Sequence, residues 1–200
     1  MARAKSEITK QKILKAALSA FKKQGYSSTS MDMIRDESGV SKATLYNYFP
    51  SKEELFLDVM MYEMEQQHGA PLFDLFEKHE LSVALKIMAK QMITVSYSKN
   101  IIATRRMLVA NASNKNLGQL CYEKGPKLGE HMMCAVFQKA MNDGILMKAE
   151  PRVVEAHFRA LVDAEFSQIF TFDLENIITA EWIEAATERA VDVLMRAYKI

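Results

Sequence analysis

The chain is poor in cysteine: its 200 residues include only two, Cys121 and Cys134. If both lie on one straight helix, a rise of about 1.5 Å per residue separates them by about 20 Å, far beyond disulfide reach. Such sparse cysteine is typical of a chain that works in a reducing, cytoplasmic setting. A redox role for the pair would require the helix to break at Gly125-Pro126.

Long apolar runs are also missing. Although 49% of the residues are hydrophobic, no stretch of about 18 uncharged apolar residues occurs, so we expect no membrane-spanning helix. The first residues, Met1-Ala-Arg-Ala-Lys5, lack the apolar segment of a secretory signal. The length suits one or two compact domains with a sizeable core.

Motifs for catalysis or metal binding are absent too. The sequence contains neither a phosphate-binding Gly-x-x-x-x-Gly-Lys loop nor a Gly-x-Ser-x-Gly nucleophile elbow. Its four histidines lack the short spacing that ligands of one metal ion need: His68, His79, His131 and His157. Nothing in the chain argues for an enzyme, and we predict neither a cofactor nor a metal site.

What the chain does contain, within residues 29–55, is a pattern of short helices joined by a tight turn. Gly39 follows the helical run 31–38 and can adopt the left-handed conformation that closes a helix. Ser41 can cap the next helix, as Ser30 can cap the preceding one. Two helices around a short Gly-containing turn predict a helix-turn-helix.

The second helix of the motif ends at Pro50, where Ser51 and Glu54 form a capping box for a long third helix. On a wheel of about 100° per residue, Leu45 and Phe49 turn to the core. The opposite face carries a small residue, a hydroxyl, a phenol and an amide, which suit base edges and phosphates: Ala43, Thr44, Tyr46 and Asn47. Three flanking residues can reach phosphate oxygens: Lys42, Tyr48 and Lys52.

About the first 65 residues resemble the tetracycline-repressor (TetR) family of bacterial transcriptional regulators. The likeness rests on a helix over residues 13–21 and on the segments Gly25-Tyr26, Thr29-Ser30, Gly39-Val40-Ser41-Lys42, Thr44-Leu45-Tyr46, Tyr48-Phe49 and Ser51-Lys52-Glu53-Glu54-Leu55. Two positions depart from it. Arg35 stands where members usually carry a small residue, and Ser38 where they carry alanine. Arg35 must therefore extend outward or find a partner.

We predict that ten residues contact DNA, and the resemblance implies eight of them. One group would read or approach bases: Lys42, Ala43, Thr44 and Asn47. Another would hold the sugar-phosphate backbone: Thr29, Tyr46, Tyr48 and Lys52. Ser30 and Ser41, at the amide ends of the two helices, complete the set. Core packing with a wet hydroxyl is the alternative for the tyrosines, and a solvated surface charge is the alternative for the lysines.

Charge is divided unevenly along the chain. Residues 1–52 carry ten Lys or Arg and four Asp or Glu, a net charge of +6, while the remainder carries 16 basic and 21 acidic residues, a net charge of −5. A basic head on an acidic body indicates an anionic partner for the head. A solvated lysine-rich helix face is the simpler alternative.

Beyond residue 66 the sequence is helical in pattern, without strand-like alternation or an internal repeat. Apolar spacing predicts helices over 81–98, 100–111, 117–142 with a kink or restart at Gly125-Pro126, 151 to about 172, and 180–198. We therefore predict an all-α protein with a helix-turn-helix DNA-binding domain at 1–50, the motif itself at about 30–49, and an effector-binding and dimerisation domain at 51–200.

The last two predicted helices carry small or apolar residues at helical spacing. These residues are Ala156, Ala160 and Ala164 in one helix, and Ala186, Ala190, Val193, Leu194 and Ala197 in the other. Small residues let helices approach closely, and stripes of this length need a partner surface. In TetR-like proteins the two helices pair with their copies across a twofold axis, so the resemblance implies a homodimer. An intramolecular bundle is the alternative.

Methionine is abundant, at fourteen residues. Flexible thioethers line adaptable apolar pockets, although a methionine stripe at helical spacing also fits plain core. The resemblance implies a ligand cavity walled by the middle helices. Its candidate lining residues are Met88, Met92, Arg106, Tyr122, His157 and Phe158. A surface or satisfied-core position is the alternative for each polar candidate.

These features predict a DNA-binding transcriptional regulator, a repressor that a small, largely apolar effector releases from double-stranded operator DNA. Effector in the body would shift the long helix that begins near Ser51 and change the separation of the two reading heads. The alternative is a nucleoid or cell-division factor of the same fold, with a protein partner and no inducer. An enclosed apolar cavity would favour the first function and a solid core the second.

Overall fold

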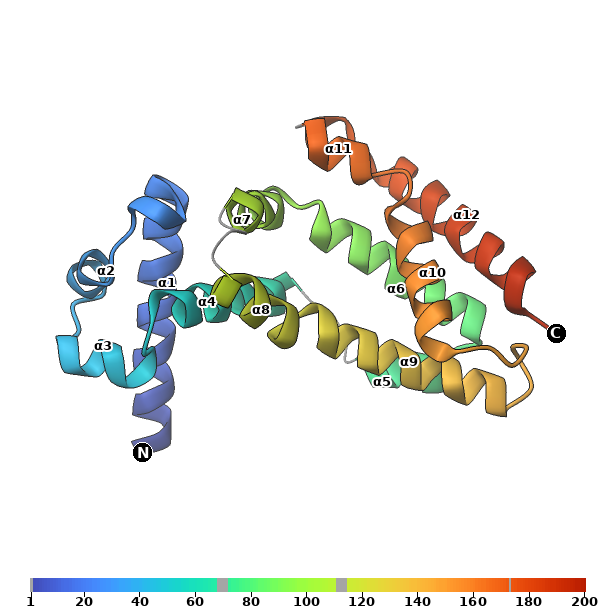
Figure 1. The fold of residues 1–200 in the computed structure, drawn as a ribbon, viewed down its shortest axis with the longest axis horizontal. Coiled ribbons are helices and arrows are strands. Elements are labelled where there is room, and N and C mark those ends of the chain that lie inside the picture. Colours follow the sequence, from blue (N-terminus) through green and yellow to red (C-terminus); the bar gives the residue numbers. More distant parts are fainter. Residues whose placement is uncertain (1, 68–71, 111–114, 173) are drawn as a thin grey trace. The chain divides into compact units, whose positions relative to one another are not determined.

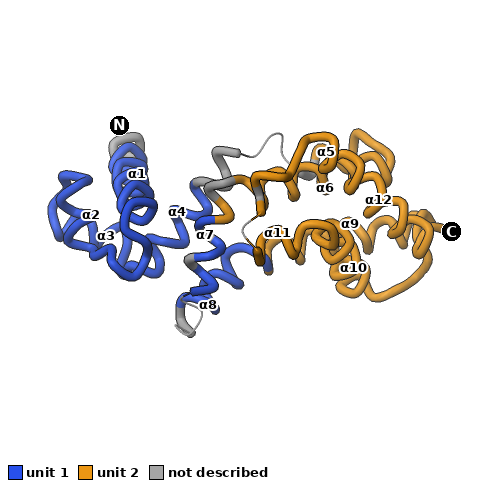
Figure 2. The backbone as a smooth tube through the Cα atoms, turned by 90° about the horizontal axis from the view of Figure 1, so that it is seen from above, with its two compact units in different colours: residues 1–66, 103–126 blue, residues 67–102, 127–200 orange. Residues whose placement is uncertain are grey.

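The computed structural model describes residues 2–67, 72–110, 115–172 and 174–200, and over these ranges the chain is helical without a β-strand (Figure 1). The predicted all-α class is confirmed. The backbone packs into two compact units (Figure 2): residues 1–66 with 103–126 form unit 1, and residues 67–102 with 127–200 form unit 2. In the described part of the chain, no helix is long and apolar enough to cross a membrane.

Unit 1 contains the helix-turn-helix. Its elements are α1 (Ala2–Ser28), α2 (Met31–Ser38), α3 (Lys42–Tyr48), α4 (Lys52–Gln67) up to residue 66, the later part of α7 (Lys99–Ala110), and α8 (Lys115–Lys124). Fifteen buried side chains, from five of these helices and the α3–α4 link, form its core: Ile13, Leu14, Ala17, Ala20, Phe21, Tyr26, Ile34, Leu45, Phe49, Leu55, Phe56, Leu57, Val59, Leu117 and Cys121. The first two turns of α4 therefore pack with the head, although the functional boundary near residue 50 stays a prediction.

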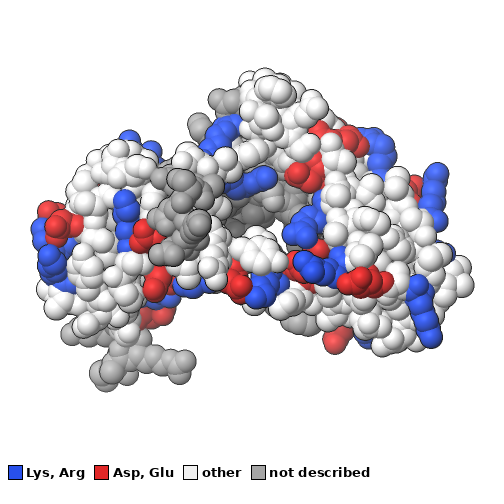
Figure 3. All heavy atoms as spheres, viewed as in Figure 1, with Lys and Arg blue, Asp and Glu red and all other residues white. Residues whose placement is uncertain are grey.

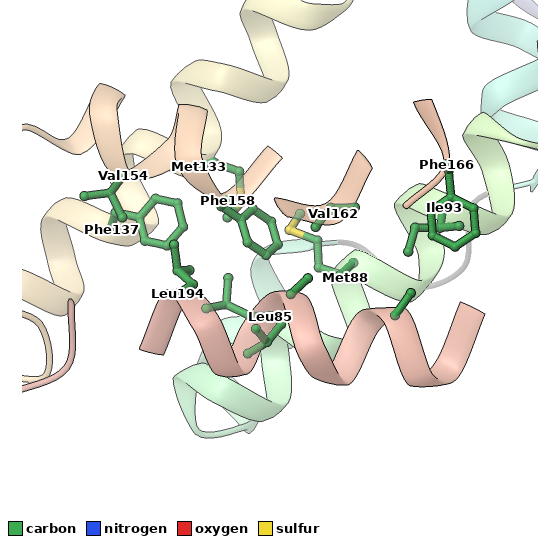
Figure 4. Packing of buried hydrophobic residues seen from close by; sticks show 14 of the residues in the cluster. Leu85, Met88, Ile93, Met133, Phe137, Val154, Phe158, Val162, Phe166 and Leu194 are labelled. Carbon is green, nitrogen blue, oxygen red and sulfur yellow. The ribbon is translucent and has the colours of Figure 1, made fainter. Parts of the chain in front are cut away.

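Unit 2 is a helical bundle. It contains α5 (Leu72–Lys78), α6 (Leu81–Ser96), α9 (Pro126–Asn142), α10 (Pro151–Asp163), α11 (Ser167–Phe172), a 3-10 turn (Glu175–Ile177) and α12 (Ala180–Tyr198). α12 packs against both α6 and α10. Figure 4 shows the apolar side chains that meet between them, with Leu85 and Met88 of α6, Phe158 of α10 and Leu194 of α12 among those labelled.

The predicted caps are confirmed. Ser30 and Ser41 each accept a hydrogen bond from the amide three residues ahead, at 3.2 and 3.1 Å. Thr179, at the start of α12, makes the same contact at 3.2 Å. Ser51 Oγ accepts from the Glu54 amide at 3.1 Å in the same way. Each contact satisfies one of the amides that a helix start leaves unpaired.

The single helix predicted from Pro151 to about Phe172 is wrong, because the chain turns at residues 164–166 and divides it into α10 and α11. The turn lets Phe166, which is fully buried, stack against Trp182 and Tyr97 with ring centres 5.3 and 5.2 Å apart. Tyr97 also donates its hydroxyl to Asp163 at 2.5 Å, at the last residue of α10. Tertiary packing here overrides the continuous helical pattern.

The restart predicted at Gly125-Pro126 does occur, between α8 and α9. Both cysteines are free thiols. Burial raises the pKa of Cys121 to about 11, and burial with nearby Glu155 and Glu130 raises the pKa of Cys134. A thiol must ionise to react, so these values argue against a redox role for either residue.

The alanine stripes point in different directions. Ala156, Ala160 and Ala164 are exposed on α10 and just beyond it. Ala186 and Ala190 are instead about 95% buried in the core of unit 2, together with Leu194. Part of the α12 stripe thus forms the surface that packs against α6 and α10 within the same chain. Of the predicted α12 residues, only Val193 and Ala197 are exposed.

Candidate nucleic-acid interface

The turn between α2 and α3 has the geometry that its sequence predicts. Gly39 has φ 63° and ψ 26°, and its amide donates to the carbonyl of Arg35 at 2.8 Å. A side chain at this φ would be strained, which explains the glycine. Ser41 then begins α3, and its hydroxyl also bonds to that of Thr44 at 2.8 Å.

α3 presents the predicted face outward. Leu45 and Phe49 are 1–2% exposed and lie in the core of unit 1. The opposite side is exposed or half-exposed and bears no carboxylate: Lys42, Ala43, Thr44, Tyr46 and Asn47. Lys42 Nζ lies 5.9 Å from the Tyr46 ring centre. A hydroxyl, an amide, a phenol and a cation are therefore gathered on one exposed helix face.

Arg35 finds partners on its own helix. Its guanidinium donates to Asp32 at 2.8 Å and to Asp36 at 2.7–2.8 Å, and the hydrogen bond to Asp36 raises the pKa of Arg35 above its usual value. Ser38, the other departure from the family pattern, is buried and donates its hydroxyl to the Arg35 carbonyl at 3.1 Å. Both departures are thus accommodated without disturbing the turn.

Acidic groups temper the basic charge of unit 1. Lys10 and Lys124 pair with Asp58 of α4 at 3.0 and 3.6 Å. On the face drawn in Figure 3, basic and acidic side chains of this unit are interspersed. The excess of lysine counted along residues 1–52 therefore does not form one uniform patch on that face. The side chains on the exposed face of α3 therefore indicate DNA binding more strongly than the net charge of unit 1 does.

Tyr48 joins α3 to α1. Its hydroxyl donates to the Ser6 carbonyl at 3.0 Å and lies 2.9 Å from the Ser6 hydroxyl. The ring is half-buried. Its bonds therefore serve to orient α3, whether or not the hydroxyl also faces a phosphate.

Two residues predicted to hold the DNA backbone face inward instead. Thr29 is 1% exposed and donates its hydroxyl to the carbonyls of Gly25 and Ala20, at 2.8 and 3.3 Å. Lys52 is half-buried and donates from Nζ to the carbonyls of Tyr26 and Thr29, both at 3.0 Å. A DNA contact through either side chain would require it to release these carbonyl partners. The sequence did not predict these hydrogen bonds. Ser30 is exposed at the start of α2, as expected.

The six candidate ligand residues do not come together in either unit. Met88, Met92 and Phe158 pack in the core of unit 2. His157 is exposed on α10, with Nδ1 2.6 Å from the Tyr198 hydroxyl. Arg106 and Tyr122 belong to unit 1, where Tyr122 is 43% exposed. The predicted six-residue pocket is therefore not assembled within one unit.

The surface hollows formed by the described residues include one in each unit. One, of about 450 Å³, lies in unit 1 and is lined by Ser51, Glu53, Glu54, Gln119, Leu120 and Glu123. The other, of about 340 Å³, lies in unit 2 and is lined by Asp192, Met195, Arg196, Lys199 and Ile200. Neither includes a predicted ligand residue. Among the residues with described placement, no group of three His, Cys, Asp or Glu could hold a metal ion.

Two protein families match the chain. Residues 13–59 match the family described as bacterial regulatory proteins, tetR family. Residues 83–200, more than half of the chain, match the family described as AefR-like transcriptional repressor, C-terminal domain. The first match contains the whole turn and α3, and the second contains all of α9–α12.

Curated relatives match over short stretches. The HTH-type transcriptional regulator YhgD of Bacillus subtilis (strain 168) is 39% identical over 61 residues, which are 29% of this chain and 32% of YhgD. The HTH-type transcriptional regulator RutR of Escherichia coli (strain K12) is 45% identical over 51 residues, 26% of this chain and 24% of RutR. The chain thus spans about a third or less of these relatives.

Solved structures match over nearly the whole length. A TetR-family transcriptional regulator from Mesorhizobium loti MAFF303099 has a TM-score of 0.83 and 27% identity, covering 98% of both chains. The flavonoid-responsive regulator FrrA has a TM-score of 0.76 and 31% identity, covering 96% of this chain and 98% of FrrA. The likeness therefore includes both units as well as the turn.

Proposed function

The chain belongs to the tetR family of bacterial regulatory proteins and is a DNA-binding transcriptional regulator; we propose that it is a repressor released from its operator by a small, largely apolar ligand. The outward face of α3 carries the DNA-binding part of this proposal. Lys42, Ala43, Thr44 and Asn47 contact base edges or their phosphates, while the α3 amides after Ser41 face the backbone.

Repression and ligand release are supported by the relatives. The family that matches residues 83–200 is described by the word repressor, and FrrA is named for its response to flavonoids, which are small molecules with aromatic rings. In this chain the ligand enters the apolar core of unit 2, beside Phe158 and beside Met88 and Met92, whose flexible thioethers can rearrange around it. Release requires a coupling of about 1–3 kcal/mol between the ligand and DNA sites.

The proposed assembly is a homodimer formed by the outer faces of the last helices. On α10 the exposed small and apolar side chains include Val153, Ala156 and Ala160, and on α12 they include Val193 and Ala197. Small or short side chains of this kind let two helices approach closely. A dimer would present two α3 helices to half-sites about 34 Å apart.

A second candidate function follows from the packing of unit 2. Its core is a cluster of packed apolar side chains, many of them large (Figure 4), and none of the buried members of this cluster lines either hollow described above. This packing favours a DNA-binding nucleoid or cell-division factor that responds to a protein partner rather than to a small molecule.

One titration separates the two functions. A duplex selected by the protein from a random-sequence pool serves as operator, and its affinity is measured across salt with and without a saturating representative flavonoid. Phosphate contacts make log affinity fall with log salt by about 0.9 per contact. Ligand release predicts weaker binding with the flavonoid. Equal affinity with and without a range of apolar ligands that bind the protein would favour the second function, and a flat salt dependence would contradict DNA binding through α3.

A further inference from the structure

We infer that Lys52 is a positioning residue of the DNA-binding head. Its ammonium fastens the first turn of α4 to the corner between α1 and α2, and it acts on DNA through the orientation of α3 rather than by neutralising a phosphate. This inference rests on the proposed contact between α3 and operator DNA.

The corner begins with a kink in α1. Gly25 has φ 78° and ψ 165°, which interrupts the helix and turns the backbone before α2. The carbonyls of Tyr26 and Thr29 both accept from Lys52 Nζ at 3.0 Å. Bonds from an ammonium are charge-assisted and stronger than those between neutral groups. Two of the three donors of Lys52 are therefore engaged inside the protein.

An aromatic face forms the third side of the ammonium site. Lys52 Nζ lies 4.3 Å from the ring centre of Tyr26, which is only 5% exposed. That ring packs 4.9 Å from the ring of Phe56 on α4 and 5.8 Å from that of Phe21 on α1. A cation over a desolvated aromatic ring is attracted more strongly than one at the surface. The site therefore joins α1, the corner and α4.

The same corner determines where α2 begins. Thr29, whose buried hydroxyl holds the carbonyls of Gly25 and Ala20, is followed at once by Ser30, the cap of α2. α2 packs along α1, and α3 follows after only three residues. Lys52 therefore fixes the start of the segment that carries the reading face. Lys42, exposed at the start of α3, is the matched lysine with no such anchoring contact among the described residues.

The test compares Lys52→Met with Lys42→Met. Affinity is measured against salt for the selected duplex and for a shuffled duplex of equal length, and amide hydrogen exchange is followed without DNA. Lys52→Met should weaken binding to the selected duplex about tenfold, because it removes charge-assisted bonds. It should change binding to the shuffled duplex far less, keep the salt slope, and speed exchange of the Met33 and Ile34 amides. Lys42→Met should lower the slope by about 0.9 on both duplexes and leave those amides unchanged.

Two results would overturn the inference. One is a slope reduced by about 0.9 with equal losses on both duplexes, which identifies Lys52 as a phosphate contact. The other is unchanged selectivity and unchanged exchange. If Lys52→Met does not fold, Thr29→Val loosens the same corner without altering charge and must show the same selective loss at an unchanged slope. Failure of the unaltered protein to select any duplex would refute the proposed function instead, while the exchange measurement would still test the corner.

Discussion

Unit 1 and unit 2 are both helical, but they hold their helices in place by different means. In unit 1, α2 and α3 have eight and seven residues, well below the about 12 at which an isolated helix becomes marginally stable. Single polar contacts at Ser30, Ser41 and Lys52 orient them. In unit 2, α6, α9 and α12 have 16, 17 and 19 residues and pack through long apolar stripes.

The position of the polar contacts differs accordingly. Lys86 and Lys90 of α6 pair with Glu188 and Glu184 of α12 on the outside of unit 2, where such pairs contribute about 0–1 kcal/mol. Unit 1 should therefore be sensitive to the loss of one hydrogen bond, whereas unit 2 should be sensitive to the loss of buried volume. Four substitutions probe this difference.

Phe158→Ala should have the largest effect, because it empties a fully buried position between Phe137 and α12. We expect the free energy of unfolding to fall by about 3–5 kcal/mol, measured by urea denaturation. Val83→Ala, at a 42% exposed position of α6 in the same unit, is the control and should change it by less than about 0.5 kcal/mol. A small loss at Phe158 would mean that unit 2 does not depend on its packed volume.

Asn47→Ala should leave stability intact but cost about 1–3 kcal/mol of binding energy on the selected duplex, because it removes an exposed amide from the reading face. Binding to the shuffled duplex should not change. Gln24→Ala, another exposed amide of unit 1, is the control and should affect neither. Equal losses on both duplexes would show that Asn47 does not read bases.

Ser41→Ala should lower stability by about 1 kcal/mol, because the Thr44 amide loses its cap. Ser41→Asp restores a cap and should recover the thermal midpoint, yet its negative charge at the start of α3 should weaken DNA binding. The two variants thus separate the folding role of this position from its role in binding. If Ser41→Asp bound DNA as well as the unaltered protein, the start of α3 would not face phosphates.

The smallest effect concerns acid. Arg189 donates to both oxygens of Glu165 at 2.8 Å, and this contact, followed by Trp182, lowers the pKa of Glu165 below its ordinary value of 4.5. Because the folded pKa is depressed, the contribution to stability is present above the ordinary pKa and is lost as the pH falls below it. The pair is about a third or more exposed, so the effect should stay under about 1 kcal/mol. Glu165→Gln should flatten this part of the pH profile of unfolding; an unchanged profile would contradict the assignment.

Local signals explain why the head could be predicted closely. Gly39, Ser41 and Ser51 act through contacts within four residues of themselves, so their roles follow from spacing. Lys52 could not be placed in this way, because its acceptors lie 23 and 26 residues earlier and depend on the kink at Gly25. The pair Gly25-Tyr26 was the available signal for that corner.

The body was predicted less closely, because its faces depend on distant partners. The spacing of Ala186 and Ala190 identified a packing surface but not which surface packs against it. Phe166 likewise ends α10 through contacts with Tyr97 and Trp182, which the helical pattern before it does not reveal. Periodicity identifies the apolar side of a helix. Whether that side packs against another helix of the same chain or against a second copy depends on tertiary structure, which periodicity does not reveal.

Unit 1 is built from two separate stretches of chain, and the second of them ends at the break near Gly125. α8 returns to it from far along the sequence and inserts Leu117, which is fully buried, and Cys121. A fragment that stops near residue 66 would lack Leu117 and Cys121, and the apolar side chains that pack against them would be exposed to solvent. Chimaeras that aim to transplant the DNA specificity of this regulator onto another sensor should therefore carry over α8 as well, or redesign the surface it covers.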